Sequence, residues 1–168
     1  LKGGGPFIFG RGAEEIDYLN QYGIETYVVP GISSSFAVPA YQGIPLTKRG
    51  SSESFWVITG TTKSHKLSND IRLAAQSTAT VVILMGMSKL QEIVDIFKKQ
   101  KKNDVSVAVI QDGTTSKEKV GFGTIDTINE VVFKKKLTSP AIIIIGDVVK
   151  DRVSLSSVIN RVKEKVVH

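Results

Sequence analysis

The sequence predicts an α/β protein, and the prediction depends on two observations. First, segments with strand-like and helix-like patterns alternate along most of the chain. Second, the run PAIIIIGDVV at residues 140–149 is too apolar for a strand with one solvent-facing side, so it predicts a strand that is buried on both faces. A sheet covered by helices accounts for both observations, although a largely β second sheet is also possible.

The first part of the chain predicts a helix, a strand and a second helix in that order. Residues 12–23 carry apolar side chains three positions apart, with glutamates in the first turn and a glycine at the end. The stretch IETYVVP at residues 24–30 predicts a short strand that Pro30 closes. Small residues at 31–45 predict a short helix. The polar stretch PLTKRGSSES then indicates a domain boundary near residues 46–53.

The second part repeats the alternation. Strands are expected in SFWVITG, STATVVILMG and VSVAVIQDGTT, each of which leads into a glycine turn. Helices are expected where apolar residues recur at i, i+3, i+4 and i+7, in the stretches LQEIVDIFKKQKKN, DTINEVVFKKKL and SLSSVINRVKEKVV.

The composition disfavours several classes of site. The 168 residues include no cysteine, which excludes a disulfide framework or thiolate chemistry. The two histidines, His65 and His168, are too few to expect a histidine-built metal site. No apolar run is long enough for a bilayer span, so we expect a soluble, cytoplasmic protein with no membrane partner. The net charge of +6 fits an acidic ligand, nucleic acid or simple solubility.

Single motifs are weak. Gly5 and Gly10 have the spacing of a phosphate loop, but Arg11 and Gly12 stand where that loop requires Lys and Ser or Thr. Asp112-Gly113-Thr114 by itself indicates only a turn. The lysines at 98–102 and 134–136 are more typical of solvated helix ends than of a nucleic-acid surface, because no aromatic residues are interleaved with them.

Taken together, five stretches resemble the tetrapyrrole methylases, and most closely the branch of uroporphyrinogen-III C-methyltransferases. They are LKGGGPFIFGRGAEE, VVPGISSSFAVPAYQGIPLTKR, ILMGM, IQDGTT and SPAIIIIGDVV, and the resemblance covers residues 1 to about 149. It implies the end of a first α/β domain at residues 1–48 and a complete second α/β domain with a mixed sheet at 49–168. It also implies a homodimer.

The resemblance further implies transfer of methyl groups from S-adenosylmethionine, which becomes S-adenosylhomocysteine, to uroporphyrinogen III. The product would be precorrin-2, for sirohaem or cobalamin biosynthesis. No metal is expected. The family's first loop and its catalytic Asp and Lys precede the glycine stretch, so no catalytic residue is assigned in this chain and the chain alone is expected to be inactive. The residues expected beside the cofactor are Gly3, Gly4, Gly5, Ile8, Ser33, Ser34, Met85 and Gly113.

One position departs from the family pattern. Such enzymes usually read Gly-Gly-Asp-Pro where this chain reads Gly3-Gly4-Gly5-Pro6. Gly5 therefore lacks the carboxylate that the family places at the cofactor. This leaves open a non-catalytic alternative, in which the chain binds a tetrapyrrole or S-adenosylhomocysteine or serves as a dimerisation module. Nucleic-acid binding through the lysines is the third and weakest reading, and no nucleic-acid partner is expected.

Overall fold

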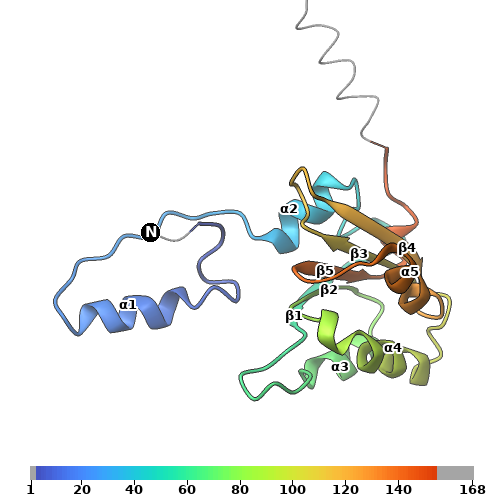
Figure 1. Cartoon of the computed structure of the whole chain (residues 1–168), viewed down its shortest axis with the longest axis horizontal. Helices are drawn as coiled ribbons and strands as arrows, with labels where there is room; N and C mark the ends of the chain where they lie inside the picture. Colours follow the sequence, from blue (N-terminus) through green and yellow to red (C-terminus); the bar gives the residue numbers. More distant parts are fainter. Residues whose placement is uncertain (1–2, 155–168) are drawn as a thin grey trace, which may run out of the picture.

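The computed structural model describes residues 3–154, and its centre is a five-stranded mixed sheet (Figure 1). The strand order is β1-β2-β5-β3-β4. β1 pairs with β2 in parallel, and the other neighbours pair antiparallel. The strands are β1 (Phe55–Thr59), β2 (Thr80–Leu84), β3 (Ser106–Gln111), β4 (Lys119–Thr124) and β5 (Ala141–Ile145). The predicted α/β class with a mixed sheet is confirmed.

The central strands are apolar on both sides because each side of the sheet is covered. In β5, Ile143 and Ile145 face one core cluster, whereas Ile142 and Ile144 face the other. β2 and β3 divide in the same way, as expected when side chains alternate along a strand. The prediction that residues 140–149 contain a strand buried on both faces is therefore confirmed.

Helices cover both faces of the sheet, and each face has its own core cluster. One core cluster contains residues of α3 (Asp70–Gln76), α4 (Leu90–Lys99) and α5 (Ile128–Lys135). The other contains residues of α2 (Ser34–Tyr41) and of the 3-10 turn η2 (Asp147–Val149). Another 3-10 turn, η1 (Met87–Lys89), leads into α4. Figure 1 shows α3 and α4 below the sheet and α2 above it.

Residues 3–33 form an extended arm that projects from the sheet (Figure 1). It carries α1 (Gly12–Asn20), which confirms the predicted helix, and Gly23 follows with a positive φ of 68°. The two ends of the arm pass very close together, since a Cβ on Gly31 would lie 1.9 Å from the Gly4 carbonyl oxygen. Only glycine fits at such a close approach of two backbones.

The predicted strand at residues 24–30 is wrong. Within residues 3–154 no strand pairs with this stretch, and the side chains of Tyr27 and Val29 are 81% and 82% exposed. An extended segment becomes part of a sheet only when a neighbour takes up its backbone hydrogen bonds.

One helix and one strand, α3 and β4, were not predicted. One predicted helix lies outside the described residues. The helix expected in SLSSVINRVKEKVV falls almost entirely in residues 155–168, beyond the described part of the chain. The domain boundary near residue 48 stays a prediction. In this structure Val38 of α2, from the first part, packs in the same core cluster as Leu84 and Ile142 from the second.

Candidate functional site

The candidate site lies at the end of the sheet where β2 and β3 finish and β5 begins. Their loops converge there because β5 runs antiparallel to both neighbours. A cavity of about 470 Å³ opens between these loops, α2 and the arm. Its lining residues are Ile8, Phe9, Ser34, Val38, Leu84, Met85, Ile110, Asp112, Gly113, Thr115, Pro140, Ala141 and Ile142.

Four of the predicted cofactor residues meet at this cavity: Ile8, Ser34, Met85 and Gly113. Ile8 comes from the arm and Ser34 is the first residue of α2. Met85 follows β2 and Gly113 follows β3 by two positions. The fold therefore brings together at one cavity segments that are far apart in the sequence.

The other predicted residues do not line the cavity. A Cβ on Gly5 would lie 3.4 Å from the Cβ and the backbone nitrogen of Ser33. Ser33 is the N-cap of α2, and its Oγ accepts a hydrogen bond from the Ser35 amide at 3.3 Å. Gly4 lies against the carbonyl of Ile32, and a Cβ on Gly3 would have no neighbour within 4 Å. A cofactor role for Gly3, Gly4, Gly5 and Ser33 stays a prediction.

Gly113 allows α2 to pack against the loop after β3. A Cβ at this position would lie 2.5 Å from Cγ1 of Val38, a side chain with little freedom to move. A second link holds the same two elements, because Glu118 accepts hydrogen bonds from Gln42 Nε2 at the end of α2 and from the Thr114 amide. The cavity wall formed by α2 is thus fixed to the loop.

The cavity is also lined by strained backbone. Phe9, Met85 and Asp112 are not glycine, yet their φ angles are 53°, 55° and 49°. The left-handed conformation costs such a residue about 1–2 kcal/mol, and residues of this kind cluster at active sites and ligand clamps. Residue type gives a hint of this strain only at Asp112, because Asp adopts φ > 0 more often than most residues. Phe9 and Met85 are of types that rarely do so.

Among the residues that the structure describes, Asp112 is the only charged one that lines the cavity. Its Oδ2 accepts a hydrogen bond from Gln111 Nε2 at 3.0 Å. Gln111 is buried, and its Oε1 accepts from the Thr138 amide at 2.8 Å. Sequence reasoning treated Asp112 as a turn residue and missed its position at the cavity.

A second cavity of about 570 Å³ adjoins the first, and Phe9 and Met85 line both. Arg11 and Lys63 supply positive charge, Glu14 supplies negative charge, and Thr59, Thr61 and Thr62 supply hydroxyl groups. Arg11 Nε lies 3.5 Å from Glu14 Oε1, and both side chains are largely exposed. Positive charges outnumber negative ones in this lining, which favours an anionic ligand. Sequence reasoning did not assign Arg11 or Lys63 to a site.

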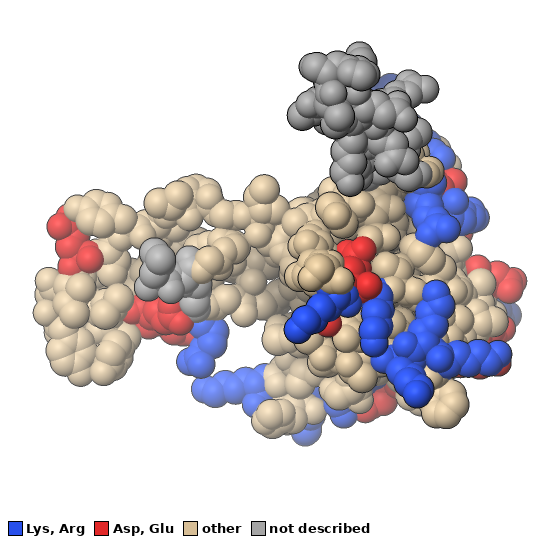
Figure 2. All heavy atoms as spheres, turned by 45° about the horizontal axis from the view of Figure 1, so that its top comes forward, with Lys and Arg blue, Asp and Glu red and all other residues tan. Residues whose placement is uncertain are grey.

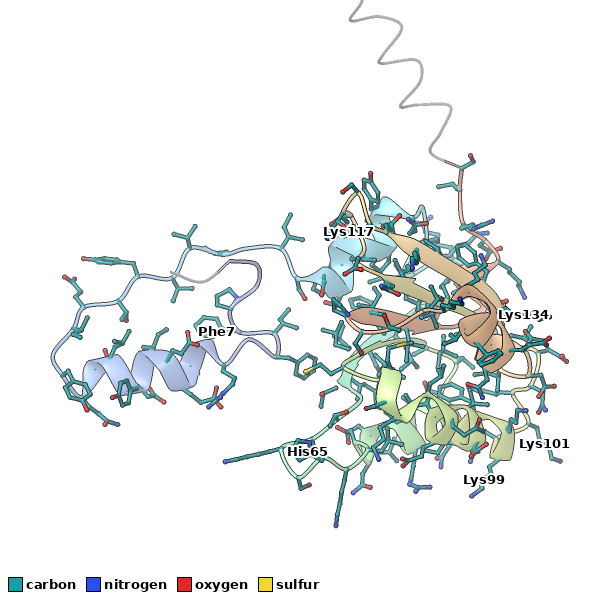
Figure 3. The ribbon with its side chains drawn as sticks, in the orientation of Figure 1. Phe7, His65, Lys99, Lys101, Lys117 and Lys134 are labelled. Atoms are coloured by element: carbon teal, nitrogen blue, oxygen red, sulfur yellow. The ribbon has the colours of Figure 1, made fainter. Side chains whose placement is uncertain are left out.

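The lysine-rich segments lie elsewhere. Figure 2 shows most Lys and Arg side chains over the sheet and its helices rather than on the arm, and Figure 3 shows Lys99, Lys101 and Lys134 at the end far from the arm. Lys98 pairs with Asp126 at 2.8 Å, and Lys134 pairs with Glu130. These contacts are those of solvated helix ends.

A metal centre has no support in residues 3–154. His65 lies on the loop between β1 and α3 (Figure 3), and the described residues contain no group of three potential metal-ligating side chains. Every helix in the described part is too short or too polar to cross a bilayer.

Comparison with known sequences identifies the family. The family Tetrapyrrole (Corrin/Porphyrin) Methylases matches residues 1–129, which is most of the chain. The chain belongs to the tetrapyrrole methylase family. The cavity at the end of β2 and β3 is therefore a feature of a tetrapyrrole methylase, and the resemblance predicted from the five sequence stretches is confirmed.

Two curated relatives show which members of the family this chain is similar to. A uroporphyrinogen-III C-methyltransferase of Methanocaldococcus jannaschii is 40% identical over 151 residues, which are 89% of this methylase chain and 62% of the relative. An S-adenosyl-L-methionine-dependent uroporphyrinogen III methyltransferase of Methanosarcina barkeri is 43% identical over 152 residues, 89% of this chain and 60% of the relative. The chain thus spans about three fifths of the length of these two proteins.

A solved structure agrees with the fold. The uroporphyrin-III C-methyltransferase of Thermus thermophilus, crystallised with S-adenosylhomocysteine, superposes with a TM-score of 0.75 at 30% identity. The match covers 89% of this methylase chain and 65% of the Thermus chain.

Proposed function

We propose that this chain is part of an S-adenosylmethionine-dependent enzyme that methylates ring carbons of uroporphyrinogen III to give precorrin-2. The pathway would be sirohaem or cobalamin biosynthesis, in the cytoplasm and as a homodimer. The names of the relatives support the reaction. The observation that carries the proposal is the single cavity formed by Ile8, Ser34, Met85 and Gly113.

The cavity suits an adenosyl ligand. Its volume of about 470 Å³ is in the range of small-molecule sites, which combine apolar walls with a few polar groups. Leu84, Ile110 and Ile142 provide apolar walls for an aromatic base. S-adenosylmethionine supplies an electrophilic methyl group on a positively charged sulfur. We also propose that Gly3, Gly4, Gly5 and Ser33 lie beside the bound cofactor.

The second cavity suits the tetrapyrrole. Uroporphyrinogen III is a polycarboxylate, and Arg11 and Lys63 can bind carboxylates with charge-assisted hydrogen bonds. Because Phe9 and Met85 line both cavities, the cavities meet beside these two residues, and a ring carbon placed at that junction would contact the methyl group directly. The protein's contribution is then alignment of the two reactants.

Two alternatives remain as test outcomes. A non-catalytic chain would bind S-adenosylhomocysteine or the tetrapyrrole without turnover. A nucleic-acid-binding chain would bind single-stranded DNA through its lysines and neither small molecule.

The experiment is a set of calorimetric titrations with uroporphyrinogen III, kept reduced, and with S-adenosylhomocysteine. We expect Arg11→Gln and Lys63→Gln each to weaken tetrapyrrole binding about 3- to 10-fold, since each removes one charge-assisted contact at an exposed site. S-adenosylhomocysteine binding should stay unchanged in both. Loss of both ligands together would contradict the division into two sites.

A methylation assay then separates the alternatives. Methylated tetrapyrrole, detected by mass spectrometry after incubation with S-adenosylmethionine, supports the enzyme. Because the chain alone is expected to be inactive, binding of both ligands without product fits both the proposed function and the non-catalytic alternative, whereas product formation excludes the alternative. Binding of single-stranded DNA with no affinity for either small molecule would overturn the proposal.

A further inference from the structure

We propose that Thr61 is a positioning residue whose hydroxyl group holds the strained backbone of Met85 and so sets the wall that the two cavities share. The inference rests on the proposed function, since it concerns the junction between the adenosyl ligand and the tetrapyrrole. Its consequence is that a single hydroxyl group, in the loop after β1, supports the binding of both ligands.

Met85 lies at the junction of the two cavities in a backbone conformation that needs support. It lines both cavities, and its φ of 55° is left-handed. A methionine rarely adopts this conformation, because its Cβ then lies too close to the carbonyl oxygen that follows. Such a conformation persists only where the surrounding structure over-determines it. The shape of the shared wall therefore depends on the contacts that hold the Met85 peptide.

Thr61 supplies such a contact. Its Oγ1 donates a hydrogen bond to the Met85 carbonyl oxygen at 2.8 Å, which is the usual length for a hydroxyl donor. The Met85 side chain is 52% exposed, so packing around it restrains this residue less than packing restrains a core residue. The hydrogen bond from Thr61 is therefore an important part of what fixes Met85.

The loop after β1 holds Thr61 beside Met85. β1 and β2 are parallel neighbours, so their carboxyl ends lie at the same edge of the sheet. The Gly60 amide donates to the Leu84 carbonyl at 2.6 Å, and a Cβ on Gly60 would lie 2.3 Å from the Gly86 Cα. The turns after the two strands thus pack backbone against backbone, which places the Thr61 hydroxyl against the turn that contains Met85.

Loss of this hydrogen bond is expected to lower the fraction of molecules in which Met85 has the conformation described above. When only that fraction is competent to bind, the apparent affinity of each ligand falls by the same factor. A ligand already bound in one cavity selects the molecules with Met85 in place, so the second ligand no longer bears the loss. The two cavities are then coupled through Met85.

The test uses calorimetric titration with S-adenosylhomocysteine and with uroporphyrinogen III, kept reduced. Thr61→Val has almost the shape of threonine and removes the hydroxyl group, whereas Thr61→Ser keeps it. Ser77→Ala is the matched control. It removes a hydrogen bond of the same 2.8 Å length, from a hydroxyl group to the Ala74 carbonyl, at the end of α3 and away from both cavities. Circular dichroism checks that each variant folds.

We expect Thr61→Val to weaken both ligands by the same factor of about 3 to 10, the range for loss of one hydroxyl hydrogen bond. Thr61→Ser and Ser77→Ala should bind both ligands as wild type does. In Thr61→Val saturated with S-adenosylhomocysteine, uroporphyrinogen III should bind about as tightly as it binds to saturated wild type.

A measurement without ligand tests the contact by itself. The chain contains two methionines, Met85 and Met87, and the NMR signals of their ¹³C-labelled methyl groups can be assigned with Met87→Leu. We expect Thr61→Val to shift or broaden the Met85 signal more than the Met87 signal. Thr61→Ser should restore the wild-type signal. An unchanged Met85 signal in Thr61→Val would overturn the inference.

The outcomes separate this inference from the proposed function. A loss that Thr61→Ser does not restore would overturn it, since the hydroxyl group would then not be the cause. A loss confined to uroporphyrinogen III would also overturn it, because Thr61 would then contact that ligand directly. An equal loss in Ser77→Ala would do the same, because any weakening of the fold would then suffice. If wild type binds neither ligand, the proposed function fails, and the methyl signals alone decide whether Thr61 holds Met85.

Discussion

Gly5 occupies a position where the structure has room for a side chain. Its φ is not among the positive values found for other glycines, and a Cβ would make ordinary contacts of 3.4–3.6 Å with Ser33 and Gly31. The strain that usually opposes replacement of a loop glycine is therefore absent here. The family pattern with Asp at this position is compatible with this backbone.

We predict that Gly5→Asp tightens S-adenosylmethionine binding about 3- to 30-fold, through attraction between the new carboxylate and the cationic ligand. Gly5→Asn is the matched control, because it adds a side chain of the same size without charge. Calorimetric titration of both variants decides the point. Equal or weaker binding by the Asp variant than by the Asn variant would show that Gly5 belongs to a differently organised site.

Gly113 gives the opposite case, since a Cβ there would lie 2.5 Å from Val38 Cγ1. We predict that Gly113→Ala lowers the free energy of unfolding by about 1–3 kcal/mol, the cost of overpacking. The cost should shrink in a Val38→Ala background, because the clashing methyl groups are gone. Gly3→Ala, where a Cβ meets nothing within 4 Å, should be near neutral. Denaturant unfolding of the four variants measures this, and strictly additive losses would contradict the assigned contact.

Among the helices and strands, those that pack in the core are the ones best predicted from the sequence. The apolar patterns of β2, β3, β5 and α4 are visible because these elements pack in the core. β4 was missed because Gly121 and Gly123 interrupt its pattern. Gly121 is required by the close packing of α5, since a Cβ there would lie 2.8–2.9 Å from Leu137 and Val131. Residues 24–30 have a strand-like composition, but composition does not supply a hydrogen-bonding neighbour.

The candidate site was predicted only through family resemblance. No local pattern indicates that Ser34, Met85 and Gly113 meet, because their meeting depends on the order of strands in the sheet. The left-handed backbone of Phe9 and Met85 and the placement of Asp112 at the cavity likewise follow from tertiary structure. These features could not be read from residue types alone.

The ion pair between Lys98 of α4 and Asp126 in the β4–α5 turn predicts that stability depends on pH. The hydrogen bond from Lys98 holds the pKa of the Asp126 carboxyl below its ordinary value, with a further contribution from Asn103. The folded state thus binds this proton more weakly than the unfolded state. The stabilising contribution is present above the ordinary carboxyl pKa and is lost as the pH falls through the lowered folded value.

We predict that Lys98→Met raises the pKa of Asp126 toward its ordinary value, because the variant removes the main hydrogen-bond donor. The control is Lys134→Met, which should raise the pKa of Glu130 and leave that of Asp126 unchanged. An NMR titration of the side-chain carboxyl carbons reports both values. An Asp126 pKa that is unaffected by Lys98→Met would remove the assigned cause.

At the scale of the whole molecule, the arm formed by residues 3–33 exposes apolar side chains to solvent. Its exposed apolar side chains include Tyr27, Val29 and Ile32, the last of which is 73% exposed. Contiguous exposed apolar surface favours association. We predict that the chain forms at least a dimer, measured by sedimentation velocity at tens of micromolar, an ordinary range for weak association.

Substitutions on the arm and on α5 test whether the arm forms the dimer contact. Val29→Ser combined with Ile32→Ser should shift the equilibrium toward monomer. Phe133→Ser should not, although Phe133 is 84% exposed, because it lies on α5 away from the arm. A wild-type monomer, or dissociation caused by Phe133→Ser alone, would contradict the prediction.

We propose that the cavity at the ends of β2 and β3 binds the adenosyl ligand, and titration with S-adenosylhomocysteine is the direct test of this binding. Ser34→Leu places a larger apolar side chain at the first cavity, whereas Thr62→Leu does so at the second cavity only. Ser34 is an exposed residue of α2 and Thr62 is a half-buried residue of the loop after β1, so circular dichroism checks that both variants fold. We expect saturable one-site binding in wild type and Thr62→Leu, and binding at least about tenfold weaker in Ser34→Leu. Undiminished binding by a folded Ser34→Leu would contradict it.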